Sequence, residues 1–206
     1  SFYNETNEGP IKPTPLIGVL GLIDSSPLHP NPPSENDVIL LIGETKDELG
    51  GSEYYEYIHN FVGGTAPSVD VSNSKKNMES VLSLISENLV KTAHDCSKGG
   101  LAIAISELCI FGKVGCHVNL NKVSTLSTEK ILFSESHSRY VLVIEKSKLD
   151  SVKNILSEKN CSFSELGMFT SDQIIFESDS NPVLELIVDK AENNYLNSLG
   201  KIIQNG

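Results

Sequence analysis

The sequence lacks several features that would assign it to a membrane, secreted or metal-binding class of protein. It has no run of 18 apolar residues and no basic-then-apolar N-terminal segment, so we expect neither a membrane span nor secretion. It also has no CxxC pair. The spacings His94-x-Cys96 and Cys116-His117 are too loose for a zinc site, so we predict no metal, reduced thiols and a cytoplasmic location.

Positive charge is scarce. The 206 residues include 16 basic and 27 acidic side chains, a net charge of −11. Such a surface repels phosphate backbones, which excludes nucleic acid as an expected partner. The acidity is more typical of a feature that keeps a protein in solution.

The familiar catalytic motifs are missing as well. There is no GxxxxGK[ST] loop for nucleotide phosphates, no dinucleotide fingerprint and no nucleophile elbow. His94, Asp95 and one of the many serines could in principle compose a catalytic triad. Without an elbow this is a weak interpretation, and the residues alone indicate no catalytic group.

What is present fits a globular domain preceded by an arm. The apolar share of 39% and the charged share of 21% are ordinary, and the length suffices for a substantial core. Residues 1–15 are polar and proline-rich, which predicts an extended arm that must lie on another surface to be ordered. The first residue is Ser1 rather than Met, so we expect an excised piece of a longer protein.

Hydrophobic periodicity predicts a mixed series of strands and helices. We predict strands at 16–23, 37–43, 91–94, 115–120, 139–145, 162–170, 173–177 and 183–188, the last two forming a hairpin-like pair. We predict helices from Ser52 to Gly63-Gly64, from 73 to about 90, at 101–111, after a capping box of Ser147 and Asp150, and at 195–203. This pattern predicts an α+β domain with a mixed β-sheet covered by helices over residues 16–206.

Two glycine-rich turns precede predicted helices and are candidate ligand sites. Gly50, Gly51 and Ser52 stand before one helix, where free backbone amides could cradle a phosphate. Glu53 in the first turn would repel an anion, so packing or capping is the preferred interpretation.

The second turn lies in the segment Lys91-Thr92-Ala93-His94-Asp95-Cys96-Ser97-Lys98-Gly99-Gly100-Leu101. Ser97, Gly99 and Gly100 form the turn itself, and His94 and Asp95 precede it. A tight turn before a helix suits either an anion or a packed domain contact.

A third candidate is the hydroxyl-rich segment of Ser134, Glu135 and Ser136. Such a loop can hydrogen-bond a sugar, a phosphate or an amide. It can equally be a solvated turn that caps itself, and the residues alone do not separate these alternatives.

Four ordered motifs carry a resemblance to a known enzyme family. They are Ser1-Phe2-Tyr3-Asn4-Glu5-Thr6 with Pro13-Thr14-Pro15; Glu48-Leu49-Gly50-Gly51-Ser52-Glu53-Tyr54; the segment His94-Asp95 to Leu101; and Leu132-Phe133-Ser134-Glu135-Ser136 with Ser138-Arg139-Tyr140. In this order they resemble the second half of formylglycinamidine ribonucleotide synthase.

The resemblance implies an architecture and a reaction. The family's large chain has two similar halves, each an ATP-binding-type domain followed by a domain related to the C-terminal domain of aminoimidazole ribonucleotide (AIR) synthase. This chain looks like the tail of the second ATP-type domain (residues 1–15) and the second C-terminal domain (residues 16–206). The full enzyme converts formylglycinamide ribonucleotide (FGAR), ATP and glutamine-derived ammonia into formylglycinamidine ribonucleotide (FGAM), ADP and phosphate.

The resemblance also implies which ligands and partners to expect. ATP and Mg²⁺ serve the full enzyme, and we expect this fragment to bind neither tightly. The family's serine of the Ser-Phe-Tyr-Asn-Glu-Thr motif contacts the substrate, which corresponds to Ser1. The Ser-Glu-Ser copy that contacts substrate is in the family's first half, whereas Ser134, Glu135 and Ser136 resemble the second copy. Expected partners are the other domains of the synthase and the glutaminase that supplies ammonia.

On this basis we expect the fragment to be inactive alone and to complete or support the active site. Two alternatives stay open. One is an auxiliary nucleotide or phosphate site near Gly50-Gly51-Ser52 and Ser97 to Gly100. The other is the matching domain of a sister family, namely AIR synthase, selenophosphate synthetase or a hydrogenase maturation protein.

Overall fold

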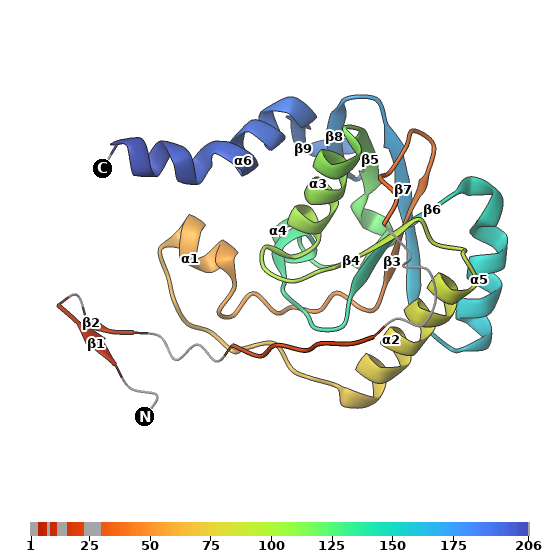
Figure 1. Cartoon of the computed structure of the whole chain (residues 1–206), viewed down its shortest axis with the longest axis horizontal. Coiled ribbons are helices and arrows are strands. Elements are labelled where there is room, and N and C mark those ends of the chain that lie inside the picture. The colour runs from red at the N-terminus through yellow and green to blue at the C-terminus, as the bar shows by residue number, and fades with distance from the viewer. Residues whose placement is uncertain (1–3, 8, 12–15, 23–29, 206) are drawn as a thin grey trace.

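A computed structural model describes residues 4–7, 9–11, 16–22 and 30–205 of the chain (Figure 1). Two short strands, β1 (Glu5–Thr6) and β2 (Gly9–Pro10), pair in antiparallel fashion within the N-terminal arm. Ser1 lies outside the described residues. The division of the chain at residue 15 stays a prediction.

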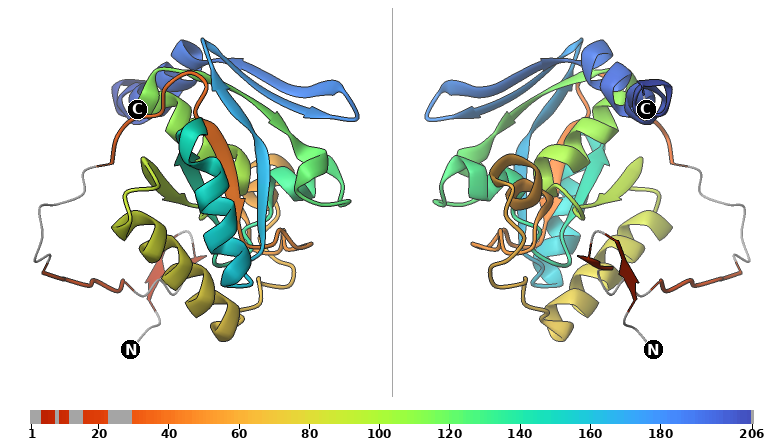
Figure 2. Two further views of the ribbon diagram at one scale, coloured as in Figure 1. Left: turned by 90° about the vertical axis from the view of Figure 1, so that its right-hand side faces the viewer. Right: turned by 90° about the vertical axis from the view of Figure 1, so that its left-hand side faces the viewer.

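The core of the domain is one seven-stranded sheet. Its strands are β3 (Val38–Ile42), β4 (Thr92–Asp95), β5 (Gly115–Asn119), β6 (Tyr140–Ile144), β7 (Phe163–Thr170), β8 (Gln173–Ser178) and β9 (Asn181–Ile187). The strand order is β4-β6-β3-β7-β5-β8-β9, and β5 with β8 is the parallel pair among otherwise antiparallel neighbours. The predicted hairpin is confirmed as β8–β9, which projects from the sheet in Figure 2.

Helices cover both faces of this sheet. On one face lie α3 (Gly100–Gly112), α4 (Thr128–Phe133) and α6 (Val188–Asn205); on the other lie α2 (Val71–Ser86) and α5 (Leu149–Glu158). Because side chains alternate along a strand, Ile39 and Leu41 of β3 pack into the α3 face, whereas Leu40 and Ile42 pack into the α2 and α5 face. The predicted α+β fold, a mixed sheet covered by helices, is confirmed.

The predicted strand over residues 16–23 is wrong for the part described. Residues 16–22 form no strand, and their large apolar side chains are 83–102% exposed. A strand needs a neighbour for its backbone donors and acceptors, and no described strand pairs with this segment. Ile23 lies outside the described residues.

Three predicted helix boundaries and one predicted cap also differ from the structure. The C-terminal helix, expected at 195–203, is α6 and already begins at Val188. The helix that Ser52 begins, α1 (Glu53–His59), ends earlier than Gly63-Gly64 because Asn60 adopts a left-handed conformation with φ 49°. The helix predicted to reach residue 90 ends at Ser86. Ser147 does not cap α5, because it lies in a 3₁₀ turn, η2 (Lys146–Lys148), through which the chain enters that helix.

Candidate functional site

The three candidate segments meet at one carboxylate. Glu135, which follows α4, accepts hydrogen bonds through Oε1 from the backbone amide of Glu53 at 2.9 Å and from that of Gly99 at 2.8 Å. These amides belong to the N-terminal ends of α1 and α3, where the helix dipole favours a negative charge. Glu135 therefore joins two helix N-termini that are 46 residues apart in the sequence, from 53 to 99.

The turn at Gly50, Gly51 and Ser52 is shaped by close packing. A Cβ atom at Gly50 would lie 2.0 Å from the carbonyl oxygen of Thr65, and Gly51 has φ +71°, a conformation that favours glycine. Ser52 is buried, and its Oγ donates to the Leu49 carbonyl at 2.6 Å and accepts from the Tyr55 amide at 3.3 Å. Ser52 is thus the N-cap of α1.

The turn at Ser97 to Gly100 packs against the third segment. Gly99 and Gly100 have φ +76° and +64°, and a Cβ atom at Gly100 would lie 2.6 Å from the Ser134 carbonyl oxygen. No side chain of the turn caps α3. The Glu135 carboxylate takes that role from outside the helix.

Ser134 and Ser136 are both buried, and their hydroxyls bind the loop after β3. Ser134 Oγ accepts from the Glu48 amide at 3.3 Å, and Ser136 Oγ accepts from the Lys46 amide at 3.1 Å. Of the two interpretations of this segment, a ligand loop and a self-capped turn, the geometry therefore favours an internal structural role.

The side chain of Arg139, which is 1% exposed, holds the Ser134 to Ser136 segment in place by hydrogen bonds to its backbone. Its Nε donates to the Ser136 carbonyl at 3.1 Å, its Nη1 donates to Thr45 Oγ1 at 2.9 Å, and its Nη2 donates to the Ser134 carbonyl. Burial lowers the pKa of the guanidinium, while the nearby carboxylates of Glu48 and Glu135 act in the opposite direction. The motif that contains Arg139 gave no signal that its charge is buried.

Glu48 is also held by the loops around it. Its Oε1 accepts from the amide and the hydroxyl of Ser68, both at 3.0 Å. Its Oε2 is buried and has no hydrogen-bond partner among the described residues. Partial burial raises the pKa of Glu48, but the hydrogen bonds from Ser68, together with the Ser136 hydroxyl and the charge of Lys46, outweigh it, so the net direction is downward.

His94 and Asp95 do not act as a pair. They occupy successive positions at the end of edge strand β4, and the contact between them, 3.8 Å from His94 Nδ1 to Asp95 Oδ1, is longer than a hydrogen bond. His94 Nε2 lies 3.2 Å from Glu107 Oε2 on α3, and its Nδ1 lies 2.8 Å from the Asp95 carbonyl oxygen. In the described chain no serine hydroxyl bonds to His94, so no triad is assembled there.

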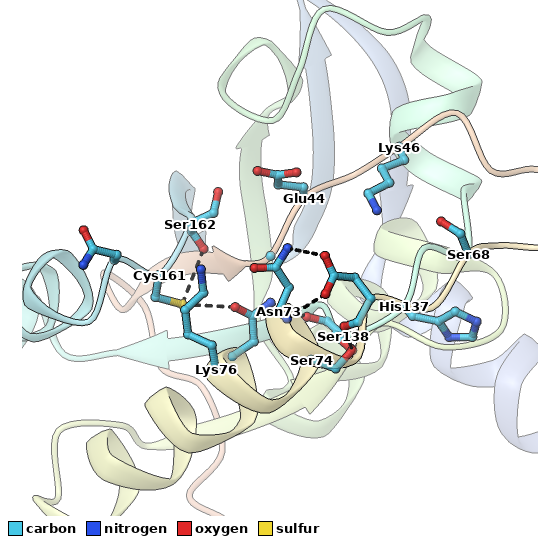
Figure 3. Close-up of a pocket in the computed structure, with 14 residues that line it drawn as sticks. Glu44, Lys46, Ser68, Asn73, Ser74, Lys76, His137, Ser138, Cys161 and Ser162 are labelled. Carbon is cyan, nitrogen blue, oxygen red and sulfur yellow. Dashed lines mark hydrogen bonds between the residues drawn. The ribbon is translucent and has the colours of Figure 1, made fainter.

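Two open hollows flank this region. One of about 340 Å³ is lined by Asp95, Ser97, Glu135 and Arg139 among others, so it brings together members of two candidate segments. The other, of about 310 Å³, lies between the loop after β3 and the start of α2 and is shown in Figure 3. It is lined by His137, which directly follows the Ser134 to Ser136 segment, and by Lys46 and Lys76, which sequence reasoning missed because they come from separate segments with no local motif.

The residues described include no group of three or more His, Cys, Asp or Glu side chains placed to hold a metal ion. The four cysteines are all free and buried. Within the part of the chain that is placed, no helix is both long and apolar enough to cross a membrane.

Curated proteins similar to this chain share one description. The chain is 39% identical over 207 residues to "Phosphoribosylformylglycinamidine synthase subunit PurL" of Thermococcus sibiricus, covering 98% of this chain and 28% of the relative. It is 37% identical over 194 residues to the protein of the same name from Alkaliphilus metalliredigens, covering 93% and 26%. The chain thus spans about a quarter of the length of the relatives it matches.

A solved structure agrees on the fold. "T. maritima PurL complexed with FGAR" superposes with a TM-score of 0.71 at 22% identity, covering 79% of this chain and 29% of that one. The family described as "AIR synthase related protein, C-terminal domain" matches residues 34–178, a stretch that runs from the turn before β3 to the end of β8 and includes the Glu135 junction. The chain therefore belongs to the AIR synthase related family and carries its C-terminal domain.

Proposed function

We propose that this chain is the C-terminal quarter of a phosphoribosylformylglycinamidine synthase subunit and supports a reaction centred elsewhere in that enzyme. One observation carries the proposal: relatives of that name align with 93–98% of this chain at 37–39% identity, and this chain accounts for only 26–28% of their length. The proposed whole enzyme is an ATP- and Mg²⁺-dependent ligase of the cytoplasm. It joins ammonia, supplied by a glutaminase, to FGAR.

The internal hydrogen bonding of the candidate segments supports a structural role for this piece. The amides at the starts of α1 and α3, which could otherwise cradle a phosphate, already bind Glu135. The hydroxyls of Ser134 and Ser136 already accept bonds from backbone amides. These groups are therefore committed to the fold, and we propose no catalytic residue among them.

The exposed apolar surface supports the proposal that further domains pack against this chain. In segment 16–22 the large apolar side chains are 83–102% exposed, and on and after α1 Ile58 and Val62 are 67% and 64% exposed. Apolar surface of this extent is typical of interfaces with other domains. We propose that the remaining domains of the synthase cover it.

An assay in which this chain is mixed with the remainder of the synthase tests this proposal. The chain alone, given ATP, Mg²⁺, FGAR and ammonia, is expected to form no FGAM. Added to the remainder of the same synthase, it is expected to restore FGAM formation. Turnover by the chain alone would contradict the supporting role. Failure to restore activity, with both pieces shown to be folded and bound to each other, would contradict the proposal that this piece completes the enzyme.

The auxiliary nucleotide site at Gly50-Gly51-Ser52 and Ser97 to Gly100 is the competing hypothesis. Glu135 disfavours it, since its carboxylate occupies the amides that would bind a phosphate. A titration with ADP, followed by hydrogen exchange, is expected to give no protection of these two turns. Protection of both turns would favour the auxiliary site instead.

A further inference from the structure

The seven-stranded sheet has two edges, and β9 is the longer and more open of them. At one edge, β4 spans four residues, and the backbone amide of Asn31 already donates to the Lys91 carbonyl beside its start at 3.0 Å. At the other edge, β9 spans seven residues and has a described strand, β8, on one side only. The β8–β9 hairpin projects beyond the helices that cover the sheet (Figure 2). The outer side of β9 is therefore the part of the sheet most accessible to a further strand.

The register with β8 fixes which backbone groups of β9 face outward. The Val188 amide donates to the carbonyl of Asp172, just before β8, at 3.0 Å, and the pairs that precede it in β9 keep the same register. Backbone groups alternate between the two sides of an antiparallel strand, so the N–H and C=O groups of Glu185 and Ile187 point away from β8. Among the described residues, no backbone hydrogen bond occupies these four groups.

The side chains along this edge are nearly symmetric about Glu185. The sequence is Val183-Leu184-Glu185-Leu186-Ile187, with apolar residues at equal distances on both sides of the carboxylate. On one face of the strand, Val183 and Ile187 are 43% and 52% exposed. On the other face, Leu184 and Leu186 are partly buried against the core. A strand with this symmetry is complementary to a second copy of itself that runs in the opposite direction.

We propose that the outer edge of β9 is a pairing surface for β9 of a second copy of this chain, and that the charge of Glu185 opposes the pairing. A two-fold axis at Glu185 places Ile187 opposite the partner's Val183. The same axis places Leu184 opposite the partner's Leu186, so both faces of the new pair gain apolar cross-strand contacts. Glu185 then faces its own copy, and like charges directly opposite each other destabilise a sheet.

Other two-fold registers are less favourable. An axis at Leu184 places Glu185 opposite the partner's Val183, and an axis at Leu186 places it opposite the partner's Ile187. Both arrangements set a carboxylate against an apolar side chain and separate the apolar residues from each other. The register centred on Glu185 is therefore the one that the sequence of β9 favours.

Two further features of β9 also weaken its outer edge. Pro182 has no N–H to donate, and the register with β8 shifts between Phe176 and Glu177, which places an irregularity at Val183. Prolines, bulges and charges on edge strands are typical devices against unwanted pairing. Glu185 is the one that lies on the proposed axis. We therefore expect the unchanged chain to associate weakly and a chain without this charge to associate more strongly.

The oligomeric state of the chain itself tests the inference, which does not rest on the proposed synthase function. Glu185→Thr removes the charge and introduces a residue that favours strands, so the dissociation constant of the dimer is expected to fall at least about tenfold. Sedimentation equilibrium from about 10 µM to 1 mM protein, in about 0.15 M salt to screen the overall net charge, measures the constant. Glu158→Thr, at the exposed end of α5, removes the same charge far from β9 in the sequence and is expected to change the constant less than about twofold.

Hydrogen exchange locates the contact. In the Glu185→Thr chain, the amides of residues 185 and 187 are expected to become protected as the protein concentration rises, because they face the second copy. The amides of residues 186 and 188 are expected to be protected at every concentration, because they face β8 and its preceding turn. Adding Ile187→Asp to the same variant is expected to return it to the monomer.

Four results would overturn the inference. The first is a Glu185→Thr chain that stays monomeric up to the highest concentration, and the second is a Glu158→Thr chain that associates equally well. The third is a dimer that persists when Ile187→Asp is added. The fourth is association that protects segment 16–22 or α1 instead of residues 185 and 187.

Discussion

Arg139 is the single arginine of the chain, and the fold buries it beneath the Ser134 to Ser136 segment. It forms no ion pair within 4.0 Å with a described carboxylate; its donors go to two backbone carbonyls and to Thr45. Its main task is therefore to satisfy a buried piece of backbone. Such groups are costly to leave unpaired.

Removing this guanidinium is expected to destabilise the domain. Arg139→Met should lower the free energy of unfolding by about 2–4 kcal/mol, because the Ser134 and Ser136 carbonyls lose their donor inside the protein. Arg139→Lys keeps the charge but cannot donate to all three acceptors, so an intermediate loss is expected. Urea unfolding followed by circular dichroism measures both. Exposed Lys190→Met is the control, and an equal effect there would contradict the role of Arg139.

The buried thiol of Cys96 is a second residue with a testable effect: it makes the free energy of unfolding depend on pH. Burial raises the pKa of its thiol to about 11, whereas an unfolded thiol ionises near pH 9. The unfolded state therefore loses its proton first as the pH rises. The stability linked to Cys96 is fully present below pH 9 and falls between pH 9 and about 11, by about 3 kcal/mol.

The measurement compares Cys96→Ala with the unchanged chain. The difference in unfolding free energy between the two proteins is expected to shrink as the pH rises from 9 to 11, since other titrating groups cancel in the difference. Iodoacetamide should also react slowly with folded Cys96 below pH 9. A difference that stays constant over this pH range would show that the folded thiol ionises as readily as the unfolded one.

At the scale of elements, Glu135 sets how α1 and α3 begin. Glu135→Ala should raise the hydrogen-exchange rates of the Glu53 and Gly99 amides by about tenfold, because both lose their acceptor. Glu135→Gln keeps a neutral acceptor oxygen and should give a smaller increase.

Glu129→Gln is the matched control, because that carboxylate accepts from Ser127 within its own segment at 2.7 Å. It is expected to leave the Glu53 and Gly99 amides unchanged. Equal exchange in Glu135→Ala and in the unchanged protein would mean that the junction does not hold the two helix starts together.

Local patterns predicted most elements of the sheet but not its order. The run Val38–Ile42 is apolar at every position, which indicates a strand buried on both faces, and β3 is indeed an interior strand whose five residues are all buried. No local signal shows that β3 pairs with β6 and β7, because pairing depends on residues far along the chain. The short helix α4 was missed, since six residues are too few for a clear period.

The candidate site shows the same limit. The glycines before α1 and α3 and the hydroxyls of Ser134 and Ser136 were recognised as unusual from the sequence alone. Their shared partner, Glu135 Oε1, was not, because it bonds to amides 82 and 36 residues away. The wrong prediction of a strand over residues 16–23 has a related cause. Apolar composition predicts that a segment is buried, but it does not show which surface buries it.

At the scale of the whole molecule, segment 16–22 predicts a separation between stability and assembly. A Val19→Asp, Leu20→Asp double variant should unfold within about 0.5 kcal/mol of the unchanged chain, because both side chains are 89% or more exposed. The same variant should restore much less FGAM formation when mixed with the rest of the synthase, since a charge would be placed in the proposed interface.

Val183→Asp, at an exposed position of β9, is the control and should restore activity as the unchanged chain does. Urea unfolding and the mixing assay together give the result. Full recovery of activity by the double variant would contradict a role of segment 16–22 in assembly, whatever its effect on stability.

The position of β3 has a consequence for how the chain reaches this structure. β3 is the first strand of the sheet in the sequence, yet its two neighbours, β6 and β7, lie in the second half of the chain. During synthesis, the most apolar strand therefore emerges long before either partner exists. Long-range pairing of this kind slows folding, and the intermediates expose apolar side chains and unpaired strand edges that favour aggregation. Fragments that stop before Thr170 should thus aggregate, and the sheet should close only when its last third has been made.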